Sequence, residues 1–508
     1  MGQSLASKAI SGLKWNTIST IANAVMQIGY TSIMARLLDP EAFGLVAISI
    51  IILQFGGYFA NMGLNKALIQ IDELKNEHIR AAFTSSFLLG LVFTGLVCAL
   101  APLAAQLFKN PDVAPVVRVM SLTFLVNGMS ATAFSLLERN MRFKAISILE
   151  TSSYVISYLG IGVLLAYLDF GVYSLIIASL SQATIVGLSS YAIVRHNIIM
   201  LFKWSAWKPL FSYGSKMSVN SLLEWFSASL PSILIGRLLG DYKLGIYDRA
   251  HKLVSLPMYM LTRTISKVIF PSFSKMQADN EKLGKVYLSS ITLVIALVIP
   301  ACAGIFVAAP ELVYVLLGKQ WGESVPILQI LSFAVAINLI TMFAGIICDA
   351  KAALNSKIVL NIVFVSVLGI LMFSLKGFGL QGFAMAFLLA ELVRTLFYQR
   401  AMHKILILPY RQQLSVYLPG IINGAVIGVL LYLFSSFLRT TALAPLLILV
   451  AQVITGAILL AILSLLFPHK ILKSEIQAIL TKTGLSDKLS TRSGRAFQLY
   501  KSYILNTK

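Results

Sequence analysis

The feature that constrains this chain most is a series of apolar runs, each about 20 residues long, which is the length that crosses a bilayer as a helix. Because lipid cannot hydrogen-bond the backbone, each run is predicted to be a transmembrane helix. The composition agrees, since 58% of the 508 residues are hydrophobic and 12% are charged. We expect an all-α integral membrane protein with fourteen spans, at 12–35, 43–68, 82–107, 114–137, 147–168, 172–194, 213–239, 244–270, 286–309, 325–348, 354–375, 378–401, 416–438 and 442–467.

The net charge of +21 could indicate a nucleic-acid partner, but its distribution favours a membrane topology instead. With the N-terminus in the cytoplasm, most of the loop Lys and Arg residues fall in inside loops, as the positive-inside rule requires. Both termini are therefore expected in the cytoplasm, and no nucleic-acid partner is expected. The outside loops hold Arg36, Lys109, Arg237, Lys243, Lys319, Lys376 and Arg439.

Two segments repeat each other 201 positions apart. Residues 35–44 (ARLLDPEAFG) align with residues 236–245 (GRLLGDYKLG), which places Arg36 on Arg237 and Gly44 on Gly245. Further along the chain the offset drifts to 211, as loop insertions in an old duplication would produce. Duplicated membrane bundles are typical of transporters, and an even number of spans in each copy predicts parallel repeats.

The repeat predicts the domain organisation. Residues 1–194 form an N-terminal lobe of six spans and residues 213–401 form a C-terminal lobe of six. Residues 195–212 are expected to be a cytoplasmic interfacial linker, and 402–467 carry two appended spans. The tail, 468–508, is basic with an apolar helical side, which predicts an amphipathic cytoplasmic segment.

The strongest candidate site is a basic stripe on the span at 244–270. At about 100° per residue, Arg249, Lys252, Arg263 and Lys267 lie on one face of the helix. A charged side chain that faces lipid at the bilayer centre costs about 2.5–3.5 kcal/mol, so a water-filled cavity is the more favourable environment for these four bases. The stripe predicts an anion-binding wall. Alternatively, Arg249 and Lys267 snorkel to opposite interfaces and the inner two bases alone need an explanation.

Other candidates have less support from the sequence. Lys14 and Lys216 begin the first and seventh spans, and Lys66 aligns with Lys267 through the repeat. These lysines could ring the cytoplasmic mouth of a cavity, although positive-inside flanking explains them equally well. Glu224 lies inside a span, where a carboxylate is costly unless it is paired or titrates. It is a candidate for ion coupling or for a structural ion pair.

No arrangement of residues indicates an enzyme, a cofactor or a metal site. Residues 377–382 fit the dinucleotide pattern GxGxxG, but they lie between two predicted membrane helices without a preceding strand. The three cysteines are far apart and predict neither a disulfide framework nor a metal site.

Three segments resemble bacterial exopolysaccharide flippases: residues 32–48 (SIMARLLDPEAFGLVAI), 268–283 (VIFPSFSKMQADNEKL) and 318–332 (GKQWGESVPILQILS). These are Wzx-type members of the polysaccharide transporter family, in the multidrug/oligosaccharidyl-lipid/polysaccharide (MOP) superfamily, and the colanic-acid and teichuronic-acid exporters are the most similar subgroup. The resemblance covers essentially the whole chain.

The resemblance implies a flippase that moves polyprenyl-diphosphate-linked oligosaccharide from the cytoplasmic to the outer leaflet of the bacterial inner membrane, by alternating access, for exopolysaccharide and lipopolysaccharide biosynthesis. It implies a polysaccharide polymerase as a candidate partner, and the sequence is compatible with a monomer. Related flippases place cavity bases on the first, second and eighth spans. The positions here that fit are Lys14, Lys66, Arg249, Lys252, Arg263 and Lys267.

Two other functions compete with this prediction. An ion-coupled drug or cation antiporter of the same superfamily would need acidic residues in its cavity, whereas the surplus charge within these spans is basic. A membrane polymerase or ligase would be expected to place catalytic residues on a substantial outer loop, whereas every predicted outer loop is short.

Overall fold

The computed structural model describes residues 5–61, 68, 69, 71, 73–202, 218–276, 279–351 and 353–466, and every regular element in this part of the chain is a helix. The predicted all-helical class is confirmed. Up to residue 202 the helices are α1 (Leu5–Leu37), α2 (Pro40–Asn61), α4 (Asn76–Phe108), α5 (Val113–Arg139), α6 (Phe143–Tyr154), the π-helix η1 (Val155–Gly162), α7 (Val163–Tyr167) and α8 (Val172–Val194). From residue 218 they are α10 (Ser218–Lys275), α11 (Asn280–Leu316), η2 (Lys319–Trp321), α12 (Ser324–Ala350), α13 (Leu354–Ser374), η3 (Lys376–Phe378), α14 (Gly379–Leu406), α15 (Tyr410–Ser415), α16 (Leu418–Arg439) and α17 (Pro445–Leu466).

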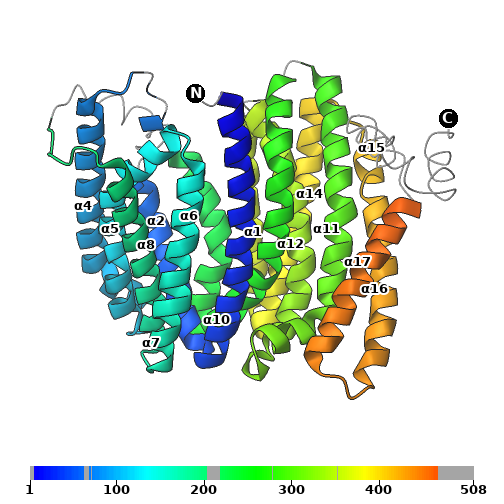
Figure 1. Ribbon diagram of the computed structural model, residues 1–508. Coiled ribbons are helices and arrows are strands. Elements are labelled where there is room, and N and C mark those ends of the chain that lie inside the picture. Colours follow the sequence, from blue (N-terminus) through cyan, green and yellow to red (C-terminus); the bar gives the residue numbers. More distant parts are fainter. Residues whose placement is uncertain are drawn as a thin grey trace, which may run out of the picture. The chain divides into compact units, whose positions relative to one another are not determined.

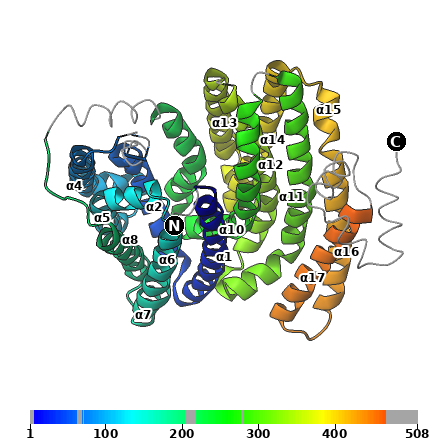
Figure 2. The ribbon, with the colours of Figure 1, turned by 45° about the horizontal axis from the view of Figure 1, so that its top comes forward.

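The chain divides into two compact units, which are described separately. In the first unit α5 packs between α4 and α8 (Figure 1). In the second, α16 and α17 pack against each other (Figure 2). The first unit comprises Met1–Lys252, Val313–Ile327 and Val365–Ala386, and the second comprises Leu253–Leu312, Leu328–Phe364 and Phe387–Lys508.

The unit boundaries cut α10, α11, α12, α13 and α14 within their length. In α11, α12, α13 and α14 the part that belongs to the first unit contains the end that the charge distribution predicts to lie outside, and in α10 it contains the break at Gly240, which is predicted to lie outside as well. The outer ends of the second repeat are therefore packed together with the first repeat in one unit.

The predicted seventh and eighth spans, 213–239 and 244–270, meet at a sharp break in α10. Gly240 has φ 87° and ψ 174°, a backbone conformation that only glycine adopts easily. A contact across the break shows that the chain reverses direction there. A Cβ at Gly236 would lie 3.2 Å from Leu244 Cδ2, whereas residues eight positions apart in a straight helix are about 12 Å apart.

Within the described residues, twelve helices are long and apolar enough to cross a membrane. The chain is thus a multi-pass membrane protein. The segment Leu222–Met258 counts once among the twelve, and the polar helix α1 is not among them. The expected number of fourteen remains a prediction, and the expected tail at 468–508 lies outside the described residues.

Candidate functional site

Two bases of the predicted stripe share one carboxylate. Asp248 Oδ2 accepts hydrogen bonds from Arg249 Nε at 3.1 Å and Nη2 at 2.7 Å, and from Lys252 Nζ at 2.9 Å. We call Asp248, Arg249 and Lys252 the charge trio. With two positive charges and one negative, the trio keeps one net positive charge, and both bases bind the same carboxylate oxygen. The Lys252 side chain is 37% exposed, whereas the Arg249 side chain is 11% exposed.

The Arg249 guanidinium also lies over an aromatic ring. Its Cζ lies 4.5 Å from the centroid of Phe43, and Phe43 packs edge-on against Trp321 at 5.4 Å. A guanidinium over an aromatic face is stabilised by the electron-rich ring. Arg249 therefore has a fixed position, and Lys252 is the more accessible base of the trio.

Three tyrosines lie close to Arg249. The rings of Tyr154 and Tyr158 stack with centroids 4.6 Å apart, and Tyr30 meets Tyr158 edge-on at 4.9 Å. Arg249 interacts electrostatically with Tyr30 and Tyr154. Tyr158 lies in the π-helix Val155–Gly162, a local structure that is often found at functional sites. One feature of the sequence indicates this cluster: Tyr154 and Tyr158 are four residues apart, which places them on one face of a helix. The candidate site predicted from the sequence does not include them.

For the remaining predicted basic residues of the site the structure describes at most the backbone. Arg263 and Lys267 share α10 with the charge trio, and the helix is continuous beyond Gly240, whereas the common face of the four bases stays a prediction. Lys14 lies on α1. The side chains of Lys14, Arg263 and Lys267 lie outside the described part of the chain, as do Lys66 and Lys216 entirely.

Glu224, the predicted coupling residue, is exposed on α10 and interacts electrostatically with Tyr58. The neighbouring Trp225 packs against Phe55 with ring centroids 4.9 Å apart. Among the described residues, no three His, Cys, Asp or Glu side chains gather as metal ligands.

The repeated hairpins cross each other at two glycines. A Cβ on Gly44 would overlap the carbonyl oxygen of Asp241, and a Cβ on Gly245 would overlap that of Pro40. Adding the repeat offset turns one contact into the other: Pro40 corresponds to Asp241, since 40 + 201 = 241, and Gly44 corresponds to Gly245, since 44 + 201 = 245. Small residues permit such close approach of helices. The hairpins are therefore related by an approximate two-fold symmetry where they meet.

The two arginines of the repeat make exchanged contacts as well. Arg36 Nη2 donates to Val315 O at 2.7 Å, at the end of α11. Arg237 Nη1 donates to Gln106 O at 3.1 Å, at the end of α4. Each arginine thus caps a helix C-terminus of the other repeat, where unpaired carbonyls and the helix dipole favour a cation.

Further hydrogen bonds reinforce these exchanged contacts. Trp321 Nε1 and Gln320 Nε2 both donate to Ala35 O, at 2.8 Å and 2.6 Å. On the other side, Asn110 Nδ2 donates to Asp241 Oδ2 at 2.9 Å. All of these residues belong to the first unit, and all lie at the end of the helices that is predicted to be outside.

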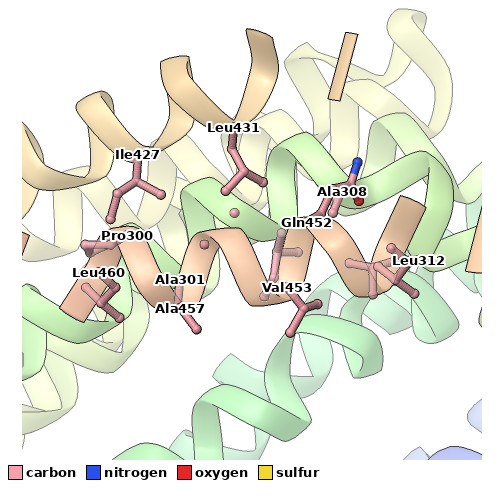
Figure 3. Close-up of a pocket in the computed structure, with 14 residues that line it drawn as sticks. Pro300, Ala301, Ala308, Leu312, Ile427, Leu431, Gln452, Val453, Ala457 and Leu460 are labelled. Atoms are coloured by element: carbon pink, nitrogen blue, oxygen red, sulfur yellow. The ribbon is translucent and has the colours of Figure 1, made fainter. Parts of the chain in front are cut away.

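The second unit holds an apolar crevice between α11, α16 and α17, with a cavity volume of about 250 Å³. Figure 3 shows aliphatic side chains of all three helices around it, among them Leu312, Leu431 and Leu460. Among the described residues that line the crevice, Gln452 alone carries a polar side chain, and its Nε2 donates to Ser435 Oγ at 3.0 Å. Such a crevice suits a hydrocarbon chain.

Comparison with known proteins agrees with this architecture. Residues 33–326, more than half of the chain, match the family described as polysaccharide biosynthesis protein. The chain belongs to this family. The resemblance to polysaccharide transporters that the sequence motifs predicted is therefore confirmed.

Two relatives and one solved structure illustrate the similarity. The lipopolysaccharide biosynthesis protein WzxC of Escherichia coli (strain K12) is 26% identical over 431 residues, which are 82% of this chain and 85% of that protein. The succinoglycan biosynthesis transport protein ExoT of Rhizobium meliloti (strain 1021) is 29% identical over 325 residues, which are 64% of this chain and 65% of that protein. The lipid II flippase MurJ, in an inward closed conformation, has a TM-score of 0.70 at 14% identity and covers 90% of this chain and 98% of its own. The likeness to MurJ shows a shared fold.

Proposed function

We propose that this polysaccharide biosynthesis protein is a flippase. It translocates polyprenyl-diphosphate-linked oligosaccharide from the cytoplasmic to the outer leaflet of a bacterial inner membrane by alternating access. One observation carries the proposal: a chain of this family is built, throughout its described part, from helices of which twelve are able to span a membrane. A membrane-embedded chain of this kind serves polymer synthesis by moving a lipid-linked precursor. ExoT is named a transport protein of succinoglycan biosynthesis, WzxC a lipopolysaccharide biosynthesis protein and MurJ a lipid II flippase.

The topology that we propose has fourteen spans with both termini in the cytoplasm. Dividing Leu222–Met258 at Gly240 and adding α1 to the twelve membrane-capable helices gives that number, since 12 + 1 + 1 = 14. The lobes at 1–194 and 213–401, the linker at 195–212, the appended spans at 402–467 and the tail at 468–508 belong to the same proposal.

The basic residues of α10 are the proposed binding wall for the diphosphate and any acidic sugars. Lys252 offers an accessible ammonium, and the Arg249 guanidinium is held beside it by Asp248 and Phe43. Hydrogen bonds between cations and phosphate oxygens are charge-assisted and therefore strong. Further candidates for the wall and for the cytoplasmic mouth are Arg263, Lys267, Lys14, Lys66 and Lys216, and the crevice of the second unit suits part of the polyprenyl tail.

The exchanged hairpin contacts suit an outer gate. Gly44 and Gly245 permit the hairpins to cross, and Arg36 and Arg237 tie each hairpin to the opposite repeat. Breaking these contacts opens the outer side, and forming them closes it. The described conformation is the one in which these contacts are made.

The proposal is tested with purified protein in liposomes that contain polyprenyl-diphosphate-linked oligosaccharide in one leaflet. We expect the protein to move the glycolipid, so that an added glycosidase gains access to it, while a cationic dye is not transported. If the dye is transported and the glycolipid stays in its leaflet, the antiporter alternative replaces the flippase.

A further inference from the structure

A buried carboxyl group in the second unit is only half satisfied. Glu391 lies in α14, within the membrane-capable segment Lys376–Leu406, and is 0% exposed. Its Oε1 accepts a hydrogen bond from Asn338 Nδ2 at 2.8 Å and a long one from Arg394 Nη1 at 3.4 Å. Its Oε2 is buried and has no hydrogen-bond partner among the residues that the structure describes. A bare carboxylate oxygen inside a membrane protein is costly, and a bound proton removes most of that cost.

The same unit contains a buried carboxylate that is fully paired, which provides an internal standard. Glu311 is 6% exposed, and Arg439 binds it in a bidentate manner, with Nε to Oε1 at 2.7 Å and Nη2 to Oε2 at 2.8 Å. Bidentate pairing of this length is typical of a permanent ion pair. In contrast, Glu391 contacts its arginine through one hydrogen bond, whose length is at the upper limit for such bonds. Its second oxygen is not paired by any described residue.

Arg394 keeps its place without relying on Glu391. Its Cζ lies 4.6 Å from the ring centroid of Phe364 and 5.7 Å from that of Tyr398. Its Nη2 donates to Asn361 Oδ1 at 3.5 Å. The guanidinium is thus positioned between Glu391 on its own helix and Asn361 on α13, and its hydrogen bond to each of them is long.

We propose that Glu391 is a proton-binding site that couples transport to the proton gradient. This inference rests on the proposed transport function. The proton binds at Oε2, and its release leaves a carboxylate that attracts Arg394 away from Asn361 and toward Glu391. Because Asn361 lies on α13, this exchange changes the contact between α13 and α14.

Three helices contribute groups to the site of Glu391. Asn338 and Thr341 come from α12, Asn361 and Phe364 from α13, and Arg394 and Thr395 from α14 itself. Within the described part of the chain, Arg394 is the charged group that acts on Glu391. The two hydroxyls bond to each other, Thr341 Oγ1 to Thr395 Oγ1 at 3.0 Å, and do not reach Oε2.

The first experiment needs no substrate. Infrared spectra of the purified protein in lipid nanodiscs are recorded between pH 5 and 9, and the carbonyl band of a protonated carboxylic acid is followed. We expect a band that grows as the pH falls, is missing in Glu391→Gln and persists in the matched control Glu311→Gln. A band that Glu391→Gln leaves unchanged, or no titrating band at all, overturns the proposal. Since glutamine mimics the protonated acid in shape and charge, the variant should fold, and Glu391→Asp provides a titratable second variant.

The second experiment separates coupling from transport itself. In liposomes, Glu391→Gln should lose the stimulation by an imposed proton gradient while retaining exchange of glycolipid in the absence of a gradient, and the matched control Glu311→Gln should retain both. Stimulation of Glu391→Gln equal to that of the wild type overturns the coupling role, as does stimulation of the wild type by sodium alone. If the wild type moves no glycolipid, the proposed function fails, and the infrared titration still decides whether Glu391 binds a proton.

Discussion

The two copies of the repeated hairpin share a backbone arrangement but not a set of charges. Gly44 and Gly245 make equivalent crossings, and Arg36 and Arg237 make equivalent caps on helices of the opposite repeat. These equivalent contacts are made by backbone atoms and by one arginine in each copy. The part of the duplication that has been retained is therefore the part that holds the two repeats together.

Immediately after the crossing the copies differ. The charge trio of α10 aligns, 201 positions earlier, with Ala47, Ile48 and Ile51, which are all buried in the first unit. Position 48 is 0% exposed as isoleucine, whereas its counterpart Arg249 is held over Phe43. One copy therefore uses these positions for packing and the other uses them for charge. From this difference we propose that substrate binding belongs to the second copy, while the crossing is a scaffold that both copies share.

The largest expected effect comes from breaking the symmetric crossing. In Gly44→Ala or Gly245→Ala, the new Cβ overlaps a backbone carbonyl oxygen, so the hairpins must separate. We expect both variants to lose transport, and the distance between spin labels at Asp39 and Lys243 to increase in each. Labels at these two positions report on the two hairpins directly.

A matched control comes from a glycine elsewhere in the same unit. A Cβ on Gly95 of α4 meets nothing within 4 Å, so Gly95→Ala should leave transport and label distance unchanged. Alanine there stabilises the helix by up to about 1 kcal/mol. If one crossing variant fails and the other transports normally, the two hairpins are not equivalent and the symmetric description is wrong.

A smaller effect is expected from removing charge in the second copy. Lys252→Gln combined with Arg263→Gln leaves the pair of Asp248 and Arg249 intact, so the protein should fold and insert. If each base makes one charge-assisted hydrogen bond to the diphosphate, worth about 1.5–3 kcal/mol, its loss weakens binding by about tenfold or more. Export should therefore fall severely, as measured in the liposome assay.

The control for this variant removes the same number of charges at the surface. Lys282 and Lys285 pair with Asp279 and Glu281, and their side chains are 73% and 74% exposed. The double change of these lysines to glutamine should leave transport near the wild-type rate. Normal export by the Lys252 and Arg263 variant would show that the charge difference between the copies has no role in binding.

The sequence predicted the helices well because lipid leaves the backbone few alternatives. It also separated the seventh and eighth spans where Gly240 breaks α10. It could not predict that the repeated hairpins cross, since that contact joins residues about 200 positions apart. The pairing of Asp248 with Lys252 is predictable from their spacing of four, a distance at which helical side chains meet, but the basic stripe predicted from the sequence does not include this carboxylate. Tyr30 could not be placed beside Tyr154, because nothing local links the first span to the fifth.

The smallest expected effect concerns the histidine that follows each of the two proposed lobes. His196, after α8, is 7% exposed between Phe83 and Tyr191, and burial lowers the pKa of its imidazole from the usual 6.5. Its counterpart near the end of α14, His403, is exposed and stacks on Tyr410. A lowered pKa in the folded state means that the unfolded segment binds the proton more readily, so local stability falls as the pH drops below about 6.5.

Hydrogen exchange of residues 195–202 at pH 5.5 and 7.5 measures this difference. Arg80 Nε binds Ile199 O at 2.9 Å, and Leu201 N donates to Thr84 Oγ1 at 2.9 Å, so opening of this segment exposes Leu201 N–H. After correction for intrinsic exchange, protection should be lower at pH 5.5 in the wild type and in His403→Gln, and independent of pH in His196→Gln. If His196→Gln and His403→Gln lose the pH response equally, the burial of His196 is not the cause of the response, and this prediction is wrong. If the pH response depends on His196 alone, the two repeats differ in chemistry at a second place. The first such difference is the charge trio, which the N-terminal repeat lacks.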